Sequence, residues 1–223
     1  MPELTYFYTP TTCSLASHIA LEESGLAFEA SRIRLHDPDA VAVWRRTNPS
    51  GGVPALIADG RLLTENVAIL DYVARLVPAA GLLPDDAFDV ARALSLTAWF
   101  ASTVHITGRM ARAPFRFTAD EAAHEPLRAE GRIRFEANLR KVDAMLAGRD
   151  WLVGDCLSVA DAYALVFYAW GVAGDYPMVE MTHYSALAQR MAERPGVQRA
   201  MAREKTPPFP VWAIKGDLSC PGS

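Results

Sequence analysis

The chain has few cysteines, and their arrangement is not that of a secreted protein. Cys13, Cys156 and Cys220 are odd in number and widely spaced along 223 residues, which does not fit a disulfide framework. We therefore expect a reduced, cytoplasmic protein in which each cysteine either packs as a small apolar side chain or works as a free thiol.

Long apolar runs and an excess of positive charge are also missing. No stretch approaches the roughly 18 apolar residues that a membrane-spanning helix needs, and the first residues lack the basic and apolar segments of a secretory signal. The 22 Lys and Arg are outnumbered by 26 Asp and Glu, giving a formal net charge of −4. We expect no nucleic-acid partner, because no basic stripe stands out to neutralise phosphates. We expect no membrane partner and no bound metal either.

The first 80 residues alternate between strand and helix patterns. β-prone runs at 4–8 and 28–35 flank a helical pattern that starts near Cys13 and stops at Gly25, since Thr or Ser before an apolar periodic run and Gly after it mark helix ends. Asp59-Gly60 between two short apolar runs predicts a two-residue hairpin, and a helix comes after it. The predicted order is βαβ, then α, ββ and α.

The remaining residues show no strand pattern between 86 and 203. Helical patterns run over 87–112, 119–146, 159–173, 184–192 and 196–203. The predicted fold class is therefore α/β plus all-α. We place a small α/β domain at 1–80, a linker at 81–90, an all-helical domain at 91–203 and an extended tail at 204–223.

Cys13 is the first candidate for chemistry. A thiol at a helix N-terminus lies near unpaired backbone N–H groups and the positive end of the helix dipole, and both favour the thiolate. The turn after a first parallel strand is also where α/β folds place ligands. The alternative is a small buried apolar side chain with no chemical role.

Two further segments could bind a peptide. If Pro54 is cis, as in a thioredoxin-like sheet, the backbone of Val53 becomes a free strand edge with which a peptide can pair. At the start of the third helix, backbone N–H groups can hold a carboxylate and Glu65 an ammonium group. An ordinary helix start with a capping Thr64 explains the second segment nearly as well.

Four motifs together resemble those of bacterial beta-class glutathione transferases. They are the runs at 8–16, 48–56, 63–69 and 152–162, and the similarity extends from about residue 4 to residue 203. The resemblance implies a thioredoxin-like N-terminal domain that holds glutathione as co-substrate, a helical domain that supplies the second-substrate pocket, and a homodimer. The last motif contains Ser158 and Asp161 at capping-box spacing, which we assign to folding.

The function implied is that of a glutathione transferase, which activates the glutathione thiol for attack on a hydrophobic electrophile, with a role in detoxification. Two roles for Cys13 stay open, donation of a hydrogen bond in conjugation and covalent thiol–disulfide exchange. The alternatives are a specialised glutathione-dependent lyase, isomerase or dehalogenase on the same fold, and a non-catalytic glutathione-binding protein.

The resemblance also assigns roles in glutathione binding. Cys13 lies beside the glutathione sulfur, Val53 before Pro54 pairs with the cysteinyl backbone, and Glu65 with Asn66 holds the γ-glutamyl end. Ser50 and Gly52 stand where the family commonly has Lys and Gln, so the glycyl carboxylate needs another partner. His36 is the candidate for that contact.

In the helical domain the family has a catalytic histidine near the sulfur, which corresponds to His105. The stretch leading to it is one residue shorter than in the family, and a deletion within a helix rotates the later residues by about 100°. His105 therefore either faces the site, faces elsewhere, or simply packs in the helix. Arg109, with Arg112 and Arg116, is either part of a solvated face or attracts an anionic substrate or the glutathione carboxylates. The predicted substrate pocket is lined by Trp99, Phe100 and Arg109.

Overall fold

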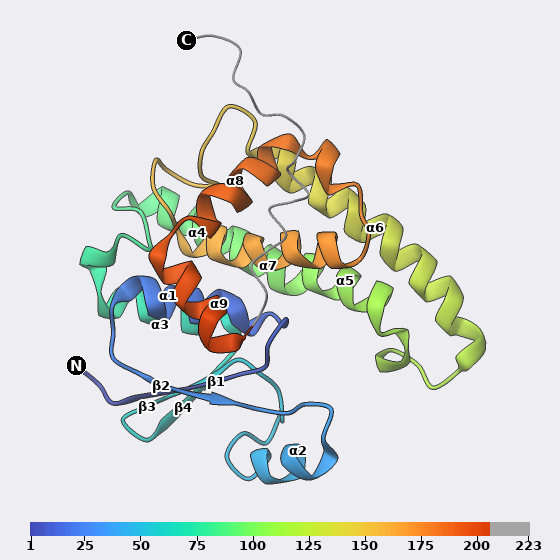
Figure 1. The fold of residues 1–223 in the computed structure, drawn as a ribbon, viewed down its shortest axis with the longest axis horizontal. Helices are drawn as coiled ribbons and strands as arrows, with labels where there is room; N and C mark the ends of the chain where they lie inside the picture. The colour runs from blue at the N-terminus through green and yellow to red at the C-terminus, as the bar shows by residue number, and fades with distance from the viewer. Residues whose placement is uncertain (206–223) are drawn as a thin grey trace.

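The computed structural model describes residues 1–205, which form a small mixed sheet flanked by helices and a larger helical part (Figure 1). The first part consists of β1 (Leu4–Tyr8), α1 (Ser14–Ser24), β2 (Glu29–Arg32), α2 (Pro38–Trp44), β3 (Ala55–Ala58), β4 (Arg61–Thr64) and α3 (Asn66–Leu76). The second consists of α4 (Ala87–Trp99), the π-helical turn η2 (Phe100–Val104), α5 (His105–Arg112), α6 (His124–Met145), α7 (Val159–Ala173), α8 (Thr182–Ala192) and α9 (Pro195–Glu204). Short 3-10 turns lie at η1 (Pro78–Ala80), η3 (Pro114–Arg116), η4 (Glu121–Ala123) and η5 (Met178–Glu180). The predicted tail falls outside the described residues from 206 onward.

The sheet has the strand order β2-β1-β3-β4. Strand β1 pairs in parallel with β2 and antiparallel with β3, and β3 pairs antiparallel with β4. The turn between β3 and β4 is the predicted Asp59-Gly60 pair, with φ of 48° and 75°. Positive φ at both central residues is what a tight turn of this kind requires, and Asp and Gly adopt it readily. The predicted hairpin is therefore confirmed.

The two faces of the sheet are covered differently. Helices α1 and α3 lie on one face, and the short helix α2 lies on the other (Figure 1). On the α2 side, the ring of Phe7 packs against Trp44 with 4.5 Å between centroids. The helical part packs on the other side, where α1 contacts both α7 and α9. The loop between β1 and α1 therefore lies at the boundary between the two parts.

Helix α7 is the centre of the helical part. Nearly all of its side chains are buried, as expected for a helix that is apolar all round. It starts with the predicted capping box: the backbone N–H and hydroxyl of Ser158 donate to Asp161 at 2.8 and 2.9 Å. Asp161 also accepts from the backbone N–H of Leu152 at 2.9 Å. The motif therefore ties the preceding loop to the helix.

The predicted fold class, a thioredoxin-like domain followed by helices, is confirmed. The main difference concerns the predicted continuous helix over 87–112, which contains the π-helical turn at Phe100–Val104. The wider turn changes the angular position of every later residue in the helix. None of the helices within residues 1–205 is long and apolar enough to cross a membrane.

Candidate active site

Cys13 occupies the N-cap position of α1, in the turn after β1. Hydroxyl groups on both sides of it fix this turn. The Thr12 and Ser14 hydroxyls both donate to the carbonyl oxygen of Thr9, at 2.8 and 3.0 Å. The turn also holds Thr11 at φ of 65°, a rare conformation for a β-branched residue. The position of Cys13 is therefore set by the backbone and by its neighbours.

The Cys13 thiol is only 8% exposed, and its S–H donates weakly to the carbonyl oxygen of Val53, with Sγ and O 3.7 Å apart. Burial raises the pKa of this thiol to about 11, although the positive charge of Arg109 acts in the opposite direction. The backbone N–H at the helix start also lowers the pKa, as expected, but desolvation is the larger effect, so Cys13 is not a thiolate. At neutral pH Cys13 is a thiol that can donate a hydrogen bond.

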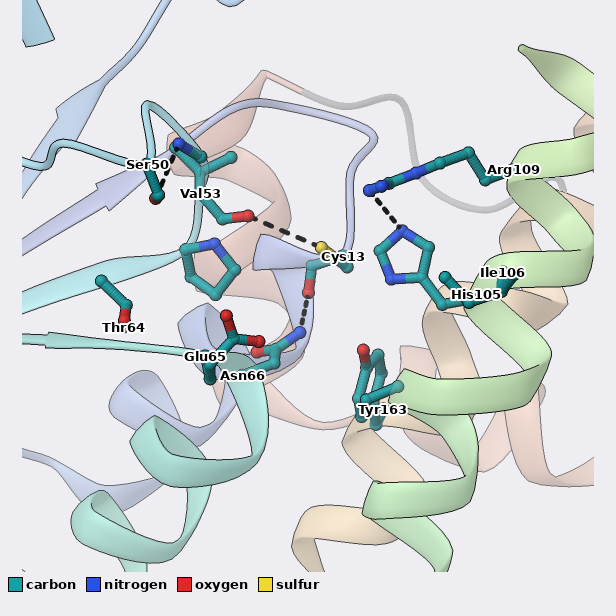
Figure 2. A pocket seen from close by; sticks show the side chains of 13 residues that line it. Cys13, Ser50, Val53, Thr64, Glu65, Asn66, His105, Ile106, Arg109 and Tyr163 are labelled. Carbon is teal, nitrogen blue, oxygen red and sulfur yellow. Dashed lines mark hydrogen bonds between the residues drawn. The ribbon is translucent and has the colours of Figure 1, made fainter. Parts of the chain in front are cut away.

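A cleft of about 290 Å³ opens above Cys13 between the two parts of the molecule (Figure 2). Residues of the β1–α1 turn, the loop before β3, the start of α3 and the helical part meet there. The lining residues are Cys13, Ser50, Gly52, Val53, Pro54, Thr64, Glu65, Asn66, Ala101, His105, Ile106, Arg109 and Tyr163. The cleft thus brings together seven of the predicted site residues, which come from both parts of the chain.

The Val53–Pro54 peptide bond on one wall of the cleft is cis, which is the isomer that peptide pairing at Val53 requires. The loop that leads to it is anchored at Gly52, whose carbonyl oxygen accepts hydrogen bonds from the Trp44 indole N–H and the Asn48 amide, both at 3.0 Å. Strand β3 begins only at Ala55. Val53 therefore lies just before the N-terminal end of β3, where its backbone is outside the strand pairing and lines the cleft.

Glu65 and Asn66 at the start of α3 have different surroundings. Glu65 is exposed and has a φ of 70°, a rare value that points to a functional constraint when it occurs in a cleft. Asn66 is buried, and its amide donates to the carbonyl oxygen of Cys13 at 2.6 Å while its oxygen accepts from the Ser17 hydroxyl. The side chain of Asn66 therefore joins α3 to the Cys13 turn, and only Glu65 offers a free side chain to a ligand.

His105 lines the cleft beside Cys13 (Figure 2). The rotation of about 100° was expected for a regular α-helix. The π-helical turn directly before His105 breaks that regularity, so the expected rotation does not apply. Nε2 of His105 accepts a hydrogen bond from Nη2 of Arg109 at 3.2 Å, so the proton of the neutral ring is on Nδ1. Burial, with help from Arg109 and Arg112, lowers the pKa of His105 to about 4.

Three predicted site residues do not lie at the cleft. His36 is exposed in the turn before α2 and does not line the cleft, so it is not supported as the partner of a glycyl carboxylate. Phe100 is fully buried and packs against Tyr163 and Phe167, because it faces the helical core. Trp99 is half-buried beside Phe100 and also does not line the cleft.

Sequence reasoning missed Tyr163, whose hydroxyl points toward the cleft (Figure 2). It lies on the buried helix α7, where its pattern is that of a core residue, and burial raises its pKa. The neighbouring Ile106 and Ala101 were missed for the same reason, since apolar helix residues give no signal of a cavity. Within residues 1–205, no three His, Cys, Asp or Glu side chains gather closely enough to hold a metal ion.

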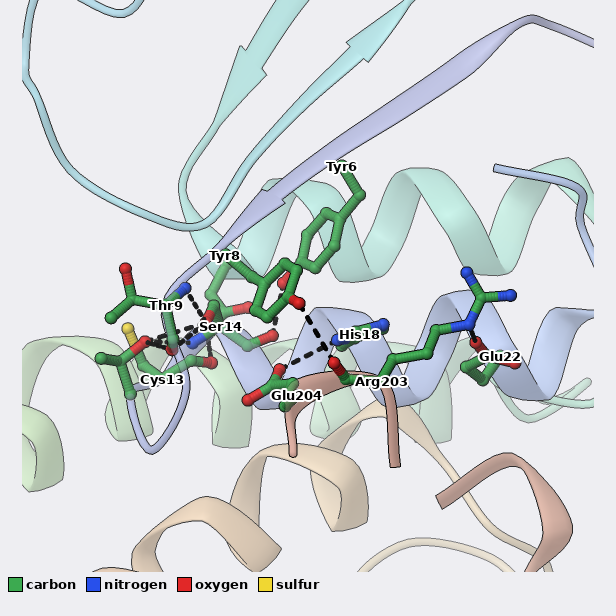
Figure 3. Close-up of polar contacts among 11 residues, drawn as sticks. Tyr6, Tyr8, Thr9, Cys13, Ser14, His18, Glu22, Arg203 and Glu204 are labelled. Atoms are coloured by element: carbon green, nitrogen blue, oxygen red, sulfur yellow. Dashed lines mark hydrogen bonds and ion pairs between the residues drawn. The ribbon is translucent and has the colours of Figure 1, made fainter. Parts of the chain in front are cut away.

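The turn that carries Cys13 is continuous with a polar junction between α1 and α9 (Figure 3). His18 of α1 pairs with Glu204 of α9, with 2.9 Å between Nδ1 and Oε1 and both side chains fully buried. The carboxylate of Glu22 forms ion pairs with Arg199 and Arg203, with 2.7 Å between Nε and the nearer carboxylate oxygen in each. These contacts fix the helical part against the helix that starts at Cys13.

Comparison with known proteins supports the resemblance carried by the motifs. The model of the glutathione S-transferase N-terminal domain matches residues 2–75, and that of the C-terminal domain matches residues 105–195. Glutathione S-transferase GstA of Escherichia coli O157:H7 is 36% identical over 205 residues, which make up 89% of this chain and 97% of that protein. This chain belongs to the glutathione S-transferase family. The transferase function expected from the sequence is confirmed, with glutathione as co-substrate, and the alternatives are not favoured.

Solved structures place this transferase near the beta class. A glutathione transferase homologue from Sulfitobacter, with bound glutathione, superposes with a TM-score of 0.83 at 30% identity, covering 91% of this chain and 99% of that one. The bacterial beta-class glutathione S-transferase of Sphingomonas chungbukensis superposes with a TM-score of 0.79 at 33% identity over 91% and 99% of the two chains. The predicted beta-class-like family is therefore confirmed for this transferase.

Proposed function

We propose that the transferase binds glutathione in the cleft above Cys13 and presents its thiolate to an electrophile on the side of the helical part. The observation that carries this proposal is the meeting of three groups at one cavity: the Cys13 thiol, the Val53 backbone ahead of β3, and the start of α3 with Glu65. Together they suit the sulfur, the peptide backbone and the γ-glutamyl end of one tripeptide.

The γ-glutamyl end of glutathione carries both a carboxylate and an ammonium group. In the proposal the carboxylate is held by the free N–H groups at the start of α3, and the ammonium group by the exposed carboxylate of Glu65, which has no ion-pair partner among the described residues. The cysteinyl backbone pairs with Val53. Asn66 contributes by holding the Cys13 turn against α3.

The chemical step in this proposal is activation of the glutathione thiol. The neutral Cys13 thiol donates its S–H to the glutathione sulfur and exchanges its weak contact with the Val53 carbonyl for a stronger one to an anion. Arg109, which His105 holds at the cleft wall, adds positive potential. Both effects favour the thiolate of glutathione, whose proton leaves to solvent. The raised pKa of Cys13 favours this role over attack on a disulfide.

Substitution Cys13→Ala separates these two roles. We expect conjugation to a neutral aryl halide to fall about tenfold or more, because one hydrogen bond to an anion is lost. The pKa of bound glutathione, measured from the ultraviolet absorbance of its thiolate, should rise. Cys156→Ala, at an exposed cysteine outside the cleft, is the matched control. Conjugation that survives intact while disulfide reduction disappears would instead assign Cys13 a covalent role.

We further propose that the transferase is a cytoplasmic homodimer that acts in detoxification. The family resemblance supports the dimer, and the large exposed side chains Phe88 on α4 and Leu62 on β4 supply apolar surface for it. Size-exclusion chromatography with light scattering tests the assembly: a mass of twice 24.4 kDa is expected, and a monomer at micromolar concentration would contradict it.

A further inference from the structure

A second cavity, which we call the arginine pocket, lies on the helical side of Cys13. Its volume is about 380 Å³, enough for a substituted aromatic ring. It is lined by Thr12, Cys13, Leu35, Val53, His105, Arg109, Arg112, Ala113, Phe115, Arg116 and Trp170. Cys13, Val53, His105 and Arg109 line both this pocket and the glutathione cleft, so the two cavities meet at the Cys13 thiol.

The arginine pocket has a strong excess of positive charge. Arg109 and Arg112 lie on α5, and Arg116 ends the following turn. No Asp or Glu is among the described residues that line the pocket, and none of the three arginines forms an ion pair with a described residue. Arginines elsewhere on the surface do find carboxylates, as Arg134 does with Glu130 at 2.5 Å.

Aromatic surface lies beside these charges. The Arg112 guanidinium carbon is 3.8 Å from the centroid of the Trp170 ring, and the Trp170 N–H is fixed by donation to the carbonyl oxygen of Thr11 at 3.0 Å. Phe115 is 63% exposed at the pocket, although it is a large apolar side chain. The walls therefore combine flat apolar surfaces with guanidinium groups, which bind carboxylates through paired N–H donors.

We propose that the second substrate of this transferase is a planar electrophile that bears a carboxylate or a similar anionic group. This inference rests on the proposed binding of glutathione in the adjacent cleft. The ring of the electrophile packs against the exposed Phe115. Its anionic group is held by Arg116 and by Arg112, whose guanidinium lies over the Trp170 ring. The reacting carbon then faces Cys13 and the sulfur of glutathione, where the two cavities meet.

A halonitrobenzoate serves as the probe of this chemistry. The glutathione thiolate attacks the ring carbon that carries chlorine, a C–S bond forms, and the C–Cl bond breaks with its electron pair leaving as chloride. The proton of the glutathione thiol is released to solvent, and no oxidant or reductant is consumed. The carboxylate of the probe is not changed by the reaction, and its electronic effect on the reacting carbon can be measured separately with free glutathione.

The test compares 4-chloro-3-nitrobenzoate with its neutral methyl ester. Each kcat/KM is divided by the rate constant of the same compound with free glutathione thiolate, which removes the difference in intrinsic reactivity. We expect the corrected preference for the carboxylate to be about tenfold or more, as for one desolvated charge-assisted contact. Rising salt should reduce it, because screening weakens such contacts. A corrected preference near one, or in favour of the ester, would overturn the proposal.

Arginine variants locate the effect. Arg116→Gln and Arg112→Gln should each lower the carboxylate-to-ester ratio several-fold, whereas Arg134→Gln, an equal change of charge on exposed α6, should leave it unchanged.

A second experiment compares glutathione with its glycyl ethyl ester. If the arginine variants raise KM for glutathione but not for its ethyl ester, and the benzoate preference stays constant, the pocket serves the glycyl carboxylate and the proposal is wrong.

Equilibrium binding separates failure of this inference from failure of the proposed function. The two conjugates, with a free carboxylate or a methyl ester on the ring, are titrated calorimetrically. Tighter binding of the carboxylate conjugate supports the arginine pocket even if neither compound is turned over, in which case only the conjugation proposal fails. Turnover of both compounds with equal affinity for the two conjugates supports conjugation and rejects the anion specificity.

Discussion

The Cys13 thiol experiences two opposing effects on its pKa, and burial is the larger one. Because the pKa is about 11, the thiolate fraction at neutral pH is small and grows about tenfold for each pH unit until the pKa is reached. Alkylation of Cys13 by iodoacetamide should therefore be slow at pH 7 and accelerate steadily up to about pH 11. Peptide mass spectrometry measures the rates, with exposed Cys156 as the internal comparison. A Cys13 rate that levels off below pH 8 would contradict the raised pKa.

His105 and Arg109 form a second residue-scale pair. With a pKa lowered to about 4, His105 is neutral above about pH 5, so kcat/KM should show no titration step from this ring between pH 5 and 8. Arg109→Met removes a positive neighbour that disfavours the imidazolium, so the pKa of His105 should rise. Titration of the ring by NMR measures both values, with Arg134→Met as the control. An unchanged pKa in Arg109→Met would show that the charge of Arg109 plays no part.

Motif residues were easier to predict from the sequence than residues that reach the site by packing. Cys13, Val53 and Glu65 stand in or beside sequence signals for a turn or a helix start, and these signals can be read from the neighbouring residues. Tyr163 and Trp170 lie on a helix that is apolar throughout, and nothing in such a pattern tells which residue borders a cavity. Trp99 and Phe100 were placed in the pocket on residue type alone, a criterion that cannot distinguish the cavity face from the core.

Among the elements, α5 carries His105, Arg109 and Arg112, and α6 sets its position. Gly131 of α6 allows the close approach of the two helices, since a Cβ there would lie 2.5 Å from the backbone nitrogen of Ala111. The regular parts of these helices were predictable from periodicity. The π-helical turn at Phe100–Val104, which orients α5 toward the cleft, was not, because its residues continue the pattern of an ordinary helix.

Gly131→Ala should push α5 away from α6. The gain in helix propensity is about 1 kcal/mol, but a clash with backbone atoms that cannot move aside should leave a net loss of about 1–3 kcal/mol in the free energy of unfolding. A loss of kcat/KM should accompany it. In Gly171→Ala the new Cβ meets the flexible Met178 side chain, so the loss should be smaller. Urea denaturation compares the two, and equal losses would rule out backbone contact as the cause.

For the whole molecule, the α1–α9 junction is one of the contacts that join the two parts. Helix α1 packs on one face of the sheet and also contacts α7 and α9. The His18–Glu204 pair crosses the junction without exposure to solvent. Burial raises the pKa of Glu204, which shows that the ionised carboxylate is costly there. The pair is therefore poor evidence of stability in itself, but removal of one partner leaves the other buried and unpaired.

Glu204→Ala should accordingly lower the free energy of unfolding by about 1–3 kcal/mol, because the buried Nδ1 of His18 loses its hydrogen-bond partner. Glu180→Ala, which breaks an exposed pair with Arg140, should cost less. The double variant His18→Leu with Glu204→Met replaces the whole pair by apolar groups and should recover most of the loss. Urea denaturation followed by both far-ultraviolet circular dichroism and tryptophan fluorescence gives the test. Coincident transitions in all variants indicate one cooperative unit. If the double variant is as unstable as Glu204→Ala, the loss comes from packing at the junction and not from the unpaired polar group of His18.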